Sequence, residues 1–390
     1  MKKPIGSLDP TLPDVHIWGA GVSGLLMAHF LKRSGWTVHL YEKNSRIGGK
    51  IRSHQISEGV YEEGPNALYA THEVEDWLKT LGLEILPATA KLKRRIWRGY
   101  PQAPLTPAEV LSLLPRLLKR TPDLLQDKTL AEFFRPLLKE KIETLLTPAL
   151  QGIYGVGADQ LSVKSIWPTL KAGTYLSVIR QLKGPKARSV SFKLGMQELI
   201  DRLAVDFKNE IQLNCTQFVM RPNTILCTNA HEASEILQNT HPRLAGELKK
   251  IEYQKLSSVM SLTPPRPEMQ QTFGFLFPRQ QGIQSLGVLF NREIFPGRCG
   301  VTFIVGENQG VNSIVQQDLQ KLNWVTQDLK VHSWEKALPI YNSQRAQAIE
   351  NMHAENINGL TLFGNYVAGI SLRDMITTSQ SFSQLYSRST

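Results

Sequence analysis

Three glycines near the N-terminus have the spacing of a phosphate-binding turn. The stretch reads Gly19-Ala20-Gly21-Val22-Ser23-Gly24. In such a turn the first glycine permits the tight bend, the second lets the backbone approach a pyrophosphate, and the third lets the following helix pack closely. The N-terminus of that helix presents free amide groups to the phosphates. The pattern therefore predicts a dinucleotide-binding site.

The residues around this turn agree with that prediction. Apolar runs at 15–18 and 37–41 predict two strands, and the apolar run between them predicts a helix. Glu42 closes the second strand eighteen residues after Gly24. A dinucleotide fold places its ribose-binding acid at a spacing of about 20 residues. An ordinary glycine turn is the alternative, but the strand, the helix and the acid together favour dinucleotide binding.

A second glycine motif follows the acid. Lys43, Arg46, Gly48 and Gly49, with Lys50 behind them, resemble the second motif of FAD-dependent oxidases and desaturases. Paired glycines and guanidinium groups suit a segment that wraps a diphosphate. A basic surface loop is the alternative. Because a NAD site would not need this second motif, we expect the cofactor to be FAD.

Length and composition indicate a globular protein of two or three domains. The chain has 390 residues, of which 41% are hydrophobic. No apolar run approaches the ~20 residues of a membrane-spanning helix, and none follows the N-terminal lysines as in a secretory signal. Three cysteines without CxxC spacing suit a reducing cytosol, and no histidine pattern predicts a metal site.

Most of the positive charge lies in one segment. The formal net charge is +11, and residues 91–141 hold twelve basic residues against five acidic ones. A nucleic-acid surface, an anionic membrane surface and a pocket for an acidic substrate are the three alternatives. The segment is rich in leucine and carries no nucleic-acid-binding motif, so we expect no nucleic acid as a partner.

Two capping boxes predict helices within residues 105–180. They begin at Thr106 with Glu109 and at Thr129 with Glu132. Leucines at 111, 114, 117 and 118 line one face of the first helix and basic residues close it. Such amphipathic helices indicate a surface that lies on a membrane. A helical subdomain that covers its own core is the alternative.

The remaining chain alternates short strands with glycine turns. Gly64-Pro65-Asn66 predicts a turn, and Gly195 predicts a strand-to-helix turn. Residues 211–215 and 218–220 are β-like runs, and residues 257–306 are rich in predicted strands. A final helix is expected to begin near Ser371. The fold class is therefore α/β, or α+β overall, with a Rossmann-like domain.

Taken in order, these motifs resemble the oxygen-dependent protoporphyrinogen oxidase family, within the monoamine-oxidase-like flavoproteins. The resemblance also rests on the stretch 150–162 with its Gly-Ile-Tyr, on Gly195-Met196-Gln197, and on motifs at 274–278, 286–290, 334–341 and 364–372. It implies oxidation of protoporphyrinogen IX to protoporphyrin IX, with flavin as hydride acceptor and dioxygen as final oxidant. Coproporphyrinogen III oxidation is the nearest alternative. An amine oxidase, a carotenoid desaturase and a non-catalytic flavin- or porphyrin-binding homologue are the others.

The resemblance also implies roles for individual residues. Arg94 would pair with a substrate propionate, and Leu276 and Phe290 would sandwich the rings, although a solvated strand residue and plain core residues are the alternatives. No side chain stands out as a catalytic base. Val219 would contact the adenine through its backbone. Eight further residues would lie near the isoalloxazine ring: Gly64, Pro65, Asn66, Trp334, Gly364, Ile370, Ser371 and Leu372.

The resemblance further suggests an organisation and partners. We expect a discontinuous FAD-binding domain (residues 14–90, 190–240 and 345–390), a substrate-binding domain (91–104 and 241–344) and a helical membrane-associated subdomain (105–180). The expected partners are a porphyrinogen, dioxygen, the cell membrane and the next haem-pathway enzyme. We expect a cytoplasmic protein that lies peripherally on the inner face of that membrane. The sequence leaves open whether the protein forms a homodimer. Trp18 departs from the family, which has a small or aliphatic residue there, and segments near 180–192 and 215–230 are short.

Overall fold

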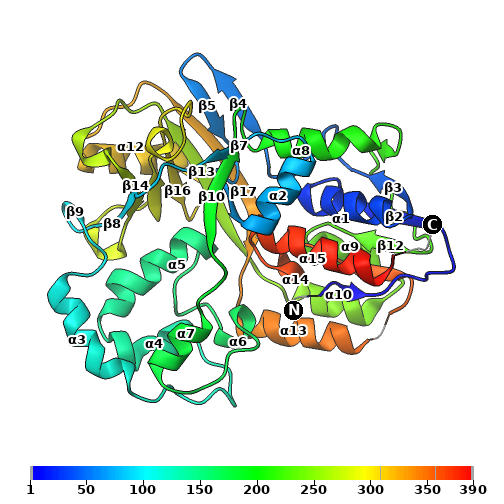
Figure 1. Cartoon of the computed structure of the whole chain (residues 1–390), viewed down its shortest axis with the longest axis horizontal. Coiled ribbons are helices and arrows are strands. Elements are labelled where there is room, and N and C mark those ends of the chain that lie inside the picture. The colour runs from blue at the N-terminus through cyan, green and yellow to red at the C-terminus, as the bar shows by residue number, and fades with distance from the viewer. Residues whose placement is uncertain (1–2, 308, 356, 388–390) are drawn as a thin grey trace. The chain divides into compact units, whose positions relative to one another are not determined.

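A computed structural model of the chain describes residues 3–307, 309–355 and 357–387 (Figure 1). Residues 1 and 2 lie outside that description. They are the first residues of the N-terminal stretch in which we expect no secretory signal. The chain divides into two compact units, each described by itself. The first comprises residues 1–88, 186–251 and 347–390, and the second comprises 89–185 and 252–346. The three-part division expected from the sequence remains a prediction.

A six-stranded sheet forms the centre of the first unit. Its order is β1-β18-β12-β2-β3-β11, and every neighbouring pair is parallel except the edge pair β1 and β18. The strands are β1 (Ile5–Gly6), β18 (Leu360–Leu362), β12 (Thr224–Leu226), β2 (Asp14–Trp18), β3 (Thr37–Tyr41) and β11 (Ile211–Gln212). Parallel strands bring their carboxyl ends to one edge, where α/β proteins bind ligands.

Helices bury one face of this sheet. Val15, Ile17, Val38 and Leu40 share a hydrophobic core with α1, α2, α8 and α15. The helices of the unit are α1 (Val22–Arg33), α2 (His72–Thr80), α8 (Gln197–Ala204), α9 (Ala230–Leu237), α10 (Pro242–Lys249), α14 (Asn365–Ala368) and α15 (Leu372–Leu385). Smaller sheets pair β6 (Leu68–Thr71), β10 (Ala187–Phe192) and β7 (Ile85–Pro87), and β4 (Ser53–Ile56) with β5 (Gly59–Glu62). Helix α13 (Ser343–Ala354) spans the division between the units.

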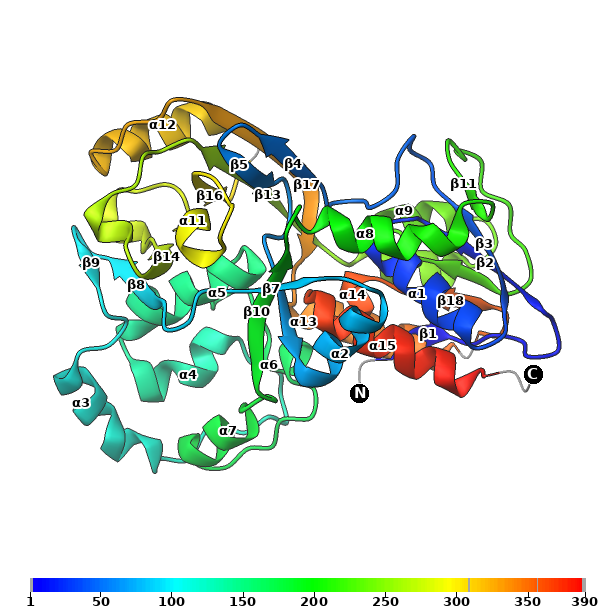
Figure 2. The same ribbon diagram turned by 45° about the horizontal axis from the view of Figure 1, so that its top comes forward.

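The second unit combines a seven-stranded sheet with a group of helices (Figure 2). The sheet order is β17 (Leu329–Pro339), β13 (Tyr253–Ser261), β16 (Val301–Val305), β15 (Gly287–Leu289), β14 (Thr272–Leu276), β8 (Lys93–Trp97) and β9 (Pro101–Gln102). Helices α11 (Asn291–Ile294) and α12 (Val311–Lys321) belong to the sheet region. The helical group contains α3 (Pro107–Leu117), α4 (Leu130–Leu138), α5 (Thr147–Tyr154), α6 (Val163–Ile166) and α7 (Tyr175–Gln181).

Both predicted capping boxes are confirmed. The Thr106 hydroxyl accepts from the Glu109 amide at 3.3 Å, and the Thr129 hydroxyl accepts from the Glu132 amide at 3.1 Å. In return, each glutamate carboxylate accepts a hydrogen bond from the backbone amide of the capping threonine. Each helix start is thereby fixed by local residues alone.

One predicted strand is wrong. Residues 218–220 form no strand, and β11 ends at Gln212, so the chain runs from β11 to β12 as an irregular loop. Phe218, Val219 and Met220 have the apolar residue types of a strand, but residue type alone makes no strand without a partner strand that pairs with it. Among the described residues, no helix is both long and apolar enough to cross a bilayer.

Candidate dinucleotide-binding site

The glycine turn joins β2 to α1 at the carboxyl edge of the parallel sheet. Gly19 has a φ of 99°, and an added Cβ there would lie 2.8 Å from the Cys227 carbonyl oxygen. At Gly24 it would lie only 1.9 Å from the Gly19 oxygen. At Gly21, the residue before α1, the nearest atom would be the Gly49 Cα at 3.7 Å, an ordinary contact. Gly19 and Gly24 are therefore required by packing, whereas packing within the chain does not require a glycine at Gly21.

The two glycine motifs lie side by side. Gly48 donates its amide to the Ala20 oxygen at 2.9 Å and forms a bridge with Gly21. Gly48 and Gly49 both have positive φ values, 97° and 58°. The Arg46 guanidinium donates to the Gly49 oxygen at 2.7 Å. A backbone conformation that favours glycine thus presents this second segment to the first turn.

Glu42 holds the first turn through both carboxylate oxygens. It is buried, its Oε2 accepts from the Ala20 amide at 2.8 Å, and its Oε1 accepts from the Asn44 amide at 3.0 Å and side chain at 2.6 Å. The expected ribose acid therefore lies against the turn. Its neighbour Lys43 is more than half exposed and forms an ion pair with Glu232.

Lys50 follows the glycine pair and is half-buried. Desolvation lowers the pKa of its ammonium to about 8, although the nearby Glu232 acts in the opposite direction. An added Cβ at Gly64 would lie 2.1 Å from the Lys50 carbonyl oxygen, so the Gly64-Pro65-Asn66 segment passes directly over this lysine's backbone. Gly64, Pro65 and Asn66 are all half-buried.

Sequence reasoning gave no role to Glu62, whose carboxylate is buried beside α8. It accepts from the Met196 amide at 2.9 Å and from the Ser53 hydroxyl at 2.6 Å. The Ser53 hydroxyl in turn accepts from the Gln197 amide at 2.9 Å. This arrangement fixes the N-terminus of α8, where the helix dipole favours a negative group. The acid pair before Gly64 was the available sequence signal.

The C-terminal cofactor candidates form a turn into the last helix. Phe363 donates its amide to the Leu226 oxygen at 3.0 Å, which sets Gly364 at the carboxyl end of β18. Ser371 caps α15, with its hydroxyl accepting from the Asp374 amide at 3.0 Å. Ile370 is half-buried and Leu372 is buried. The predicted helix start near Ser371 is confirmed.

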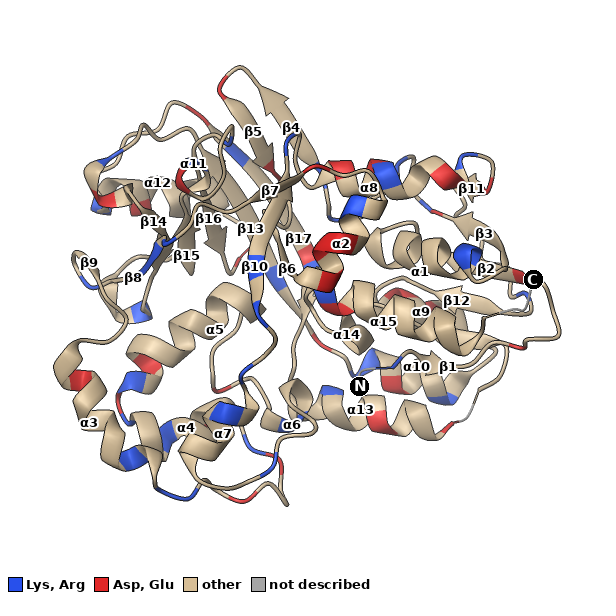
Figure 3. Cartoon of the chain, in the orientation of Figure 1, with Lys and Arg blue, Asp and Glu red and all other residues tan. Residues whose placement is uncertain are grey.

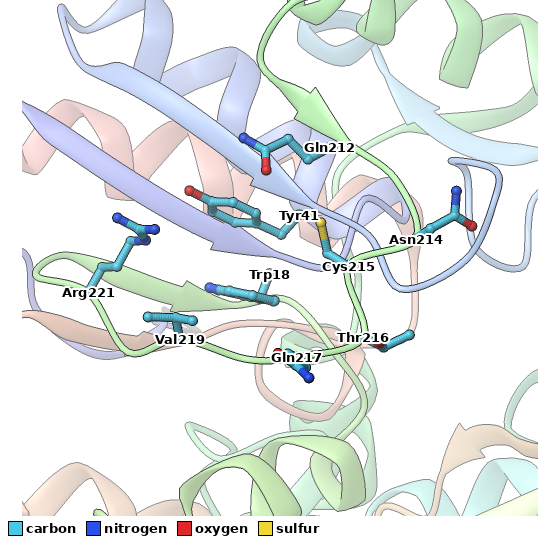
Figure 4. A pocket seen from close by; sticks show the side chains of 9 residues that line it. All are labelled: Trp18, Tyr41, Gln212, Asn214, Cys215, Thr216, Gln217, Val219 and Arg221. Atoms are coloured by element: carbon cyan, nitrogen blue, oxygen red, sulfur yellow. The ribbon is translucent and has the colours of Figure 1, made fainter.

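A solvent-open hollow of about 320 Å³ lies at the carboxyl ends of β2, β3 and β11 (Figure 4). We call it the Trp18 hollow. The indole of Trp18 and the ring of Tyr41 stack side by side within it, with centroids 4.5 Å apart and planes 20° apart. Nine residues line it: Trp18, Tyr41, Gln212, Asn214, Cys215, Thr216, Gln217, Val219 and Arg221.

The remaining substrate and cofactor candidates lie in the second unit. Arg94, on β8, is exposed, and its guanidinium lies 5.6 Å from the Phe273 ring centroid. Leu276, on β14, is half-buried, and an added Cβ at Gly152 of α5 would meet its side chain at 3.0 Å. Phe290 is fully buried in an edge-to-face contact with Phe275 at 4.7 Å. Trp334 is half-buried on β17.

These four residues differ in how much of their surface is exposed to solvent. Phe290 occupies the core of its unit, as the plain core alternative expects, whereas Leu276 and Arg94 keep surface on which a ligand could pack. Their roles remain predictions.

Comparison with known proteins defines first the class and then the relatives. Residues 17–81 match the model of the NAD(P)-binding Rossmann-like domain, so the dinucleotide-binding class is confirmed. A structure from Exiguobacterium sp. 255-15, provisionally named a protoporphyrinogen oxidase, superposes with a TM-score of 0.79 at 20% identity, covering 97% of this chain and 99% of that one. That likeness shows that the two chains share their α/β fold.

Curated relatives extend the likeness to nearly the whole chain. Protoporphyrinogen oxidase 2 of Arabidopsis thaliana is 27% identical over 467 aligned positions, covering 93% of this chain and 92% of the relative. Coproporphyrinogen III oxidase of Staphylococcus aureus is 29% identical over 50% of this chain and 52% of its own. The first alignment is longer than this chain, so the relative carries segments that this chain lacks. The chain is a homologue of the porphyrinogen oxidases.

Proposed function

We propose that this protein is an FAD-dependent porphyrinogen oxidase that converts protoporphyrinogen IX to protoporphyrin IX with dioxygen as acceptor. The observation that carries the proposal is the hydrogen-bonded pair of glycine motifs, in a chain that aligns over 93% of its length with a protoporphyrinogen oxidase. The cofactor fits the residues present, because an added Cβ at Gly21, before α1, would meet nothing closer than 3.7 Å, whereas Gly19 and Gly24 are closely packed. The amides at this helix start and Lys50 would hold the diphosphate.

The reaction removes six electrons and six hydrogens from the macrocycle. When bound, FAD supplies the two-electron acceptance for each of three successive steps and passes the electrons to dioxygen. The chain's own residues position the partners of this chemistry. Glu42 braces the first turn, and Arg46 holds the second glycine segment through the Gly49 carbonyl. Arg94 would pair with a propionate of the substrate, since a guanidinium binds carboxylate in a fixed geometry.

An aerobic assay of the FAD-loaded protein tests this function. Protoporphyrinogen IX and coproporphyrinogen III are supplied side by side, and porphyrin fluorescence is followed with time. Faster conversion of protoporphyrinogen supports the proposal, and faster conversion of coproporphyrinogen assigns the second substrate. No flavin-dependent conversion of either, with FAD shown to be bound, overturns it in favour of a binding protein or a different oxidase.

We further propose that helix α3 rests on an anionic membrane surface, as a peripheral contact on the cytoplasmic side. None of its residues is buried, Leu111 and Leu114 are 65% and 50% exposed, and Leu118, directly after the helix, is 69% exposed. Basic residues follow on the same segment at Arg116, Lys119 and Arg120, and Figure 3 shows more basic than acidic positions around α3, α4 and α7. An apolar stripe flanked by cations matches an interfacial helix.

Flotation with vesicles tests the membrane contact. At low salt the protein should float with vesicles of mixed phosphatidylcholine and phosphatidylserine, and a triple L111S/L114S/L118S variant should remain below. A matched variant of an exposed leucine outside the segment, L194S, should float like the wild type. Equal recovery of wild type and triple variant would exclude α3 as the contact. Assembly into a homodimer and transfer of the product to the next haem-pathway enzyme stay predictions, which sedimentation and coupled assays can test.

A further inference from the structure

A second solvent-open hollow, of about 510 Å³, lies within the first unit and is lined by residues of α8, β4, β11 and the second glycine segment. We call it the basic groove. No residue of the glycine turn or of α1 lines it, and it shares no lining residue with the Trp18 hollow. Nine residues line it: Arg46, Ile47, Arg52, Ser53, Gln197, Ala204, Lys208, Ile211 and Leu213.

The edge strand β11 separates the two hollows. Ile211 and Leu213 line the basic groove, whereas Gln212 and Asn214 line the Trp18 hollow. Successive side chains of an extended segment point to opposite faces, so this alternation places the hollows on opposite sides of β11 and the residues that follow it. A ligand in the basic groove therefore does not compete with one in the Trp18 hollow.

Three of the lining residues, Arg46, Arg52 and Lys208, are cationic, and none is acidic. The guanidinium of Arg46 is fixed by the backbone, because it donates to the carbonyl oxygens of Ile47 at 3.1 Å and Gly49 at 2.7 Å. A hollow lined by charges of one sign concentrates ligands of the opposite sign. Carboxylates and phosphates are the anions that guanidinium groups bind best.

Arg52 and Lys208 are only weakly engaged by carboxylates of the protein. The Arg52 guanidinium lies 3.6 Å from the Glu63 carboxylate, which is also shared with His54 at 2.6 Å. Lys208 is exposed and forms no ion pair with any residue in the described part of the chain. Because exposed ion pairs contribute little, both cations remain available to the anionic groups of a ligand.

Apolar side chains make up much of the remaining lining. Four of them are at least partly exposed: Ile47, Ala204, Ile211 and Leu213. A free phosphate would leave these side chains uncovered, and a nucleic-acid base would find no aromatic residue to stack on. Since an exposed apolar patch rimmed by polar groups is typical of a binding site, the groove suits a molecule with an apolar body and more than one anionic group.

We propose that the basic groove binds an apolar molecule that carries two carboxylates, which is the chemistry of the porphyrin that the proposed reaction releases. The choice of a porphyrin rests on the proposed function, whereas the dicarboxylate chemistry rests on the groove itself. One carboxylate pairs with Arg52 and the other with Lys208, and the aliphatic side chains contact the apolar body. The groove thus holds the product at a place separate from the glycine turn.

Equilibrium dialysis of the full-length, FAD-loaded protein against protoporphyrin IX tests this site. The wild type should retain more porphyrin per chain than an R52Q/K208Q variant, whose affinity at the groove should be about 3- to 30-fold lower after the loss of two exposed ion pairs. The dimethyl ester of the same porphyrin carries no carboxylate, so both proteins should bind it equally. A204F keeps every charge and fills the groove, and it should lose the same porphyrin.

Two matched variants serve as controls. K208R keeps the charge and should bind like the wild type, as should K249Q, which removes an exposed lysine of α10 outside the groove. Equal retention of the free acid by the wild type, R52Q/K208Q and A204F overturns the inference, as does an equal loss of the dimethyl ester in R52Q/K208Q. If the wild type oxidises no porphyrinogen but R52Q/K208Q loses the free acid alone, the proposed function fails and this inference stands.

Discussion

The glycine turn at residues 19–24 and helix α3 can both be predicted from a few local residues, but the two differ in how closely the rest of the protein packs against them. At Gly24 a single methyl group would lie 1.9 Å from a backbone oxygen, whereas no residue of α3 is buried at all. Helix α4 carries the same capping box as α3 and yet buries six residues. A local signature therefore tells where an element begins, and the neighbours decide what a substitution costs.

The largest effect is expected at the turn. Gly24→Ala should lose FAD binding and destabilise the first unit by at least about 3 kcal/mol, because the clash is with backbone that cannot move aside. Gly21→Ala provides the contrast, since its Cβ meets only ordinary contacts. It should unfold like the wild type and bind FAD more weakly. Thermal unfolding without FAD and flavin content after purification measure the two effects, and equal unfolding of both variants would contradict the assignment.

The next test compares the two capped helices directly. Phe133 on α4 is fully buried and packs edge-to-face against Phe134 at 5.0 Å, so Phe133→Ala should destabilise the protein by about 3–5 kcal/mol. Leu111→Ala on α3 should stay within about 0.5 kcal/mol. Urea unfolding gives both values. A large loss at Leu111 would show that α3 is covered in solution and would weaken the membrane proposal.

A third test concerns α1, the helix that follows the turn. His29 is buried between Phe30 and Trp77, and desolvation lowers its pKa to about 4. The unfolded chain, with a pKa near 6.5, then binds more protons than the folded chain, so stability falls as the pH drops from about 6.5 to 4 and changes no further through this group below that.

The contribution of His29 is on the order of 3 kcal/mol across that window. Unfolding measured at pH 7 and pH 4.5 should show a smaller loss in H29F than in the wild type. Part of the slope will persist, because burial also lowers the pKa of His16 to about 4. An identical loss of stability in both proteins would show that His29 does not contribute to this pH dependence.

The smallest effect is expected on cofactor affinity as a function of pH. Lys50 titrates with a pKa of about 8 in the protein alone, and a bound diphosphate would raise that pKa by favouring the ammonium. FAD binding should therefore be strongest below pH 8 and weaken by up to about 10-fold between pH 8 and 9. Fluorescence titrations at pH 7, 8 and 9 measure this. In K50M the dependence should flatten, and an unaltered slope would place Lys50 away from the phosphates.

Local residues predicted much of the candidate site because their demands are local. The turn needs Gly19 and Gly24, each helix of the capping boxes needs its own threonine and glutamate, and Ser371 caps the last helix with its own hydroxyl. The pairing of Gly21 with Gly48 was not visible in either motif alone. The role of Glu62 was also missed, because its partners Ser53 and Met196 come from distant parts of the chain.

One error has the same origin. Residues 218–220 have the apolar residue types of a strand, but they form none in the structure. Phe290 has the residue type of a ring contact and is enclosed by Phe275 and Trp324, so its role stays a prediction. Trp18 looked like an unfavourable departure, and the structure shows a stacked ring with a donor left over. Hydrogen-bond satisfaction and burial depend on neighbours that spacing does not reveal.

By itself the sequence determined the α/β class, the position of the phosphate-binding turn, the helix starts and the concentration of positive charge, because each follows from side chains within a few residues of one another. Only the tertiary structure decided which leucine-rich helix is buried, which aromatic residues are core, and that Trp18 faces an open hollow beside Glu42. Those outcomes depend on close packing between segments far apart in the chain, where a difference of one ångström separates contact from clash.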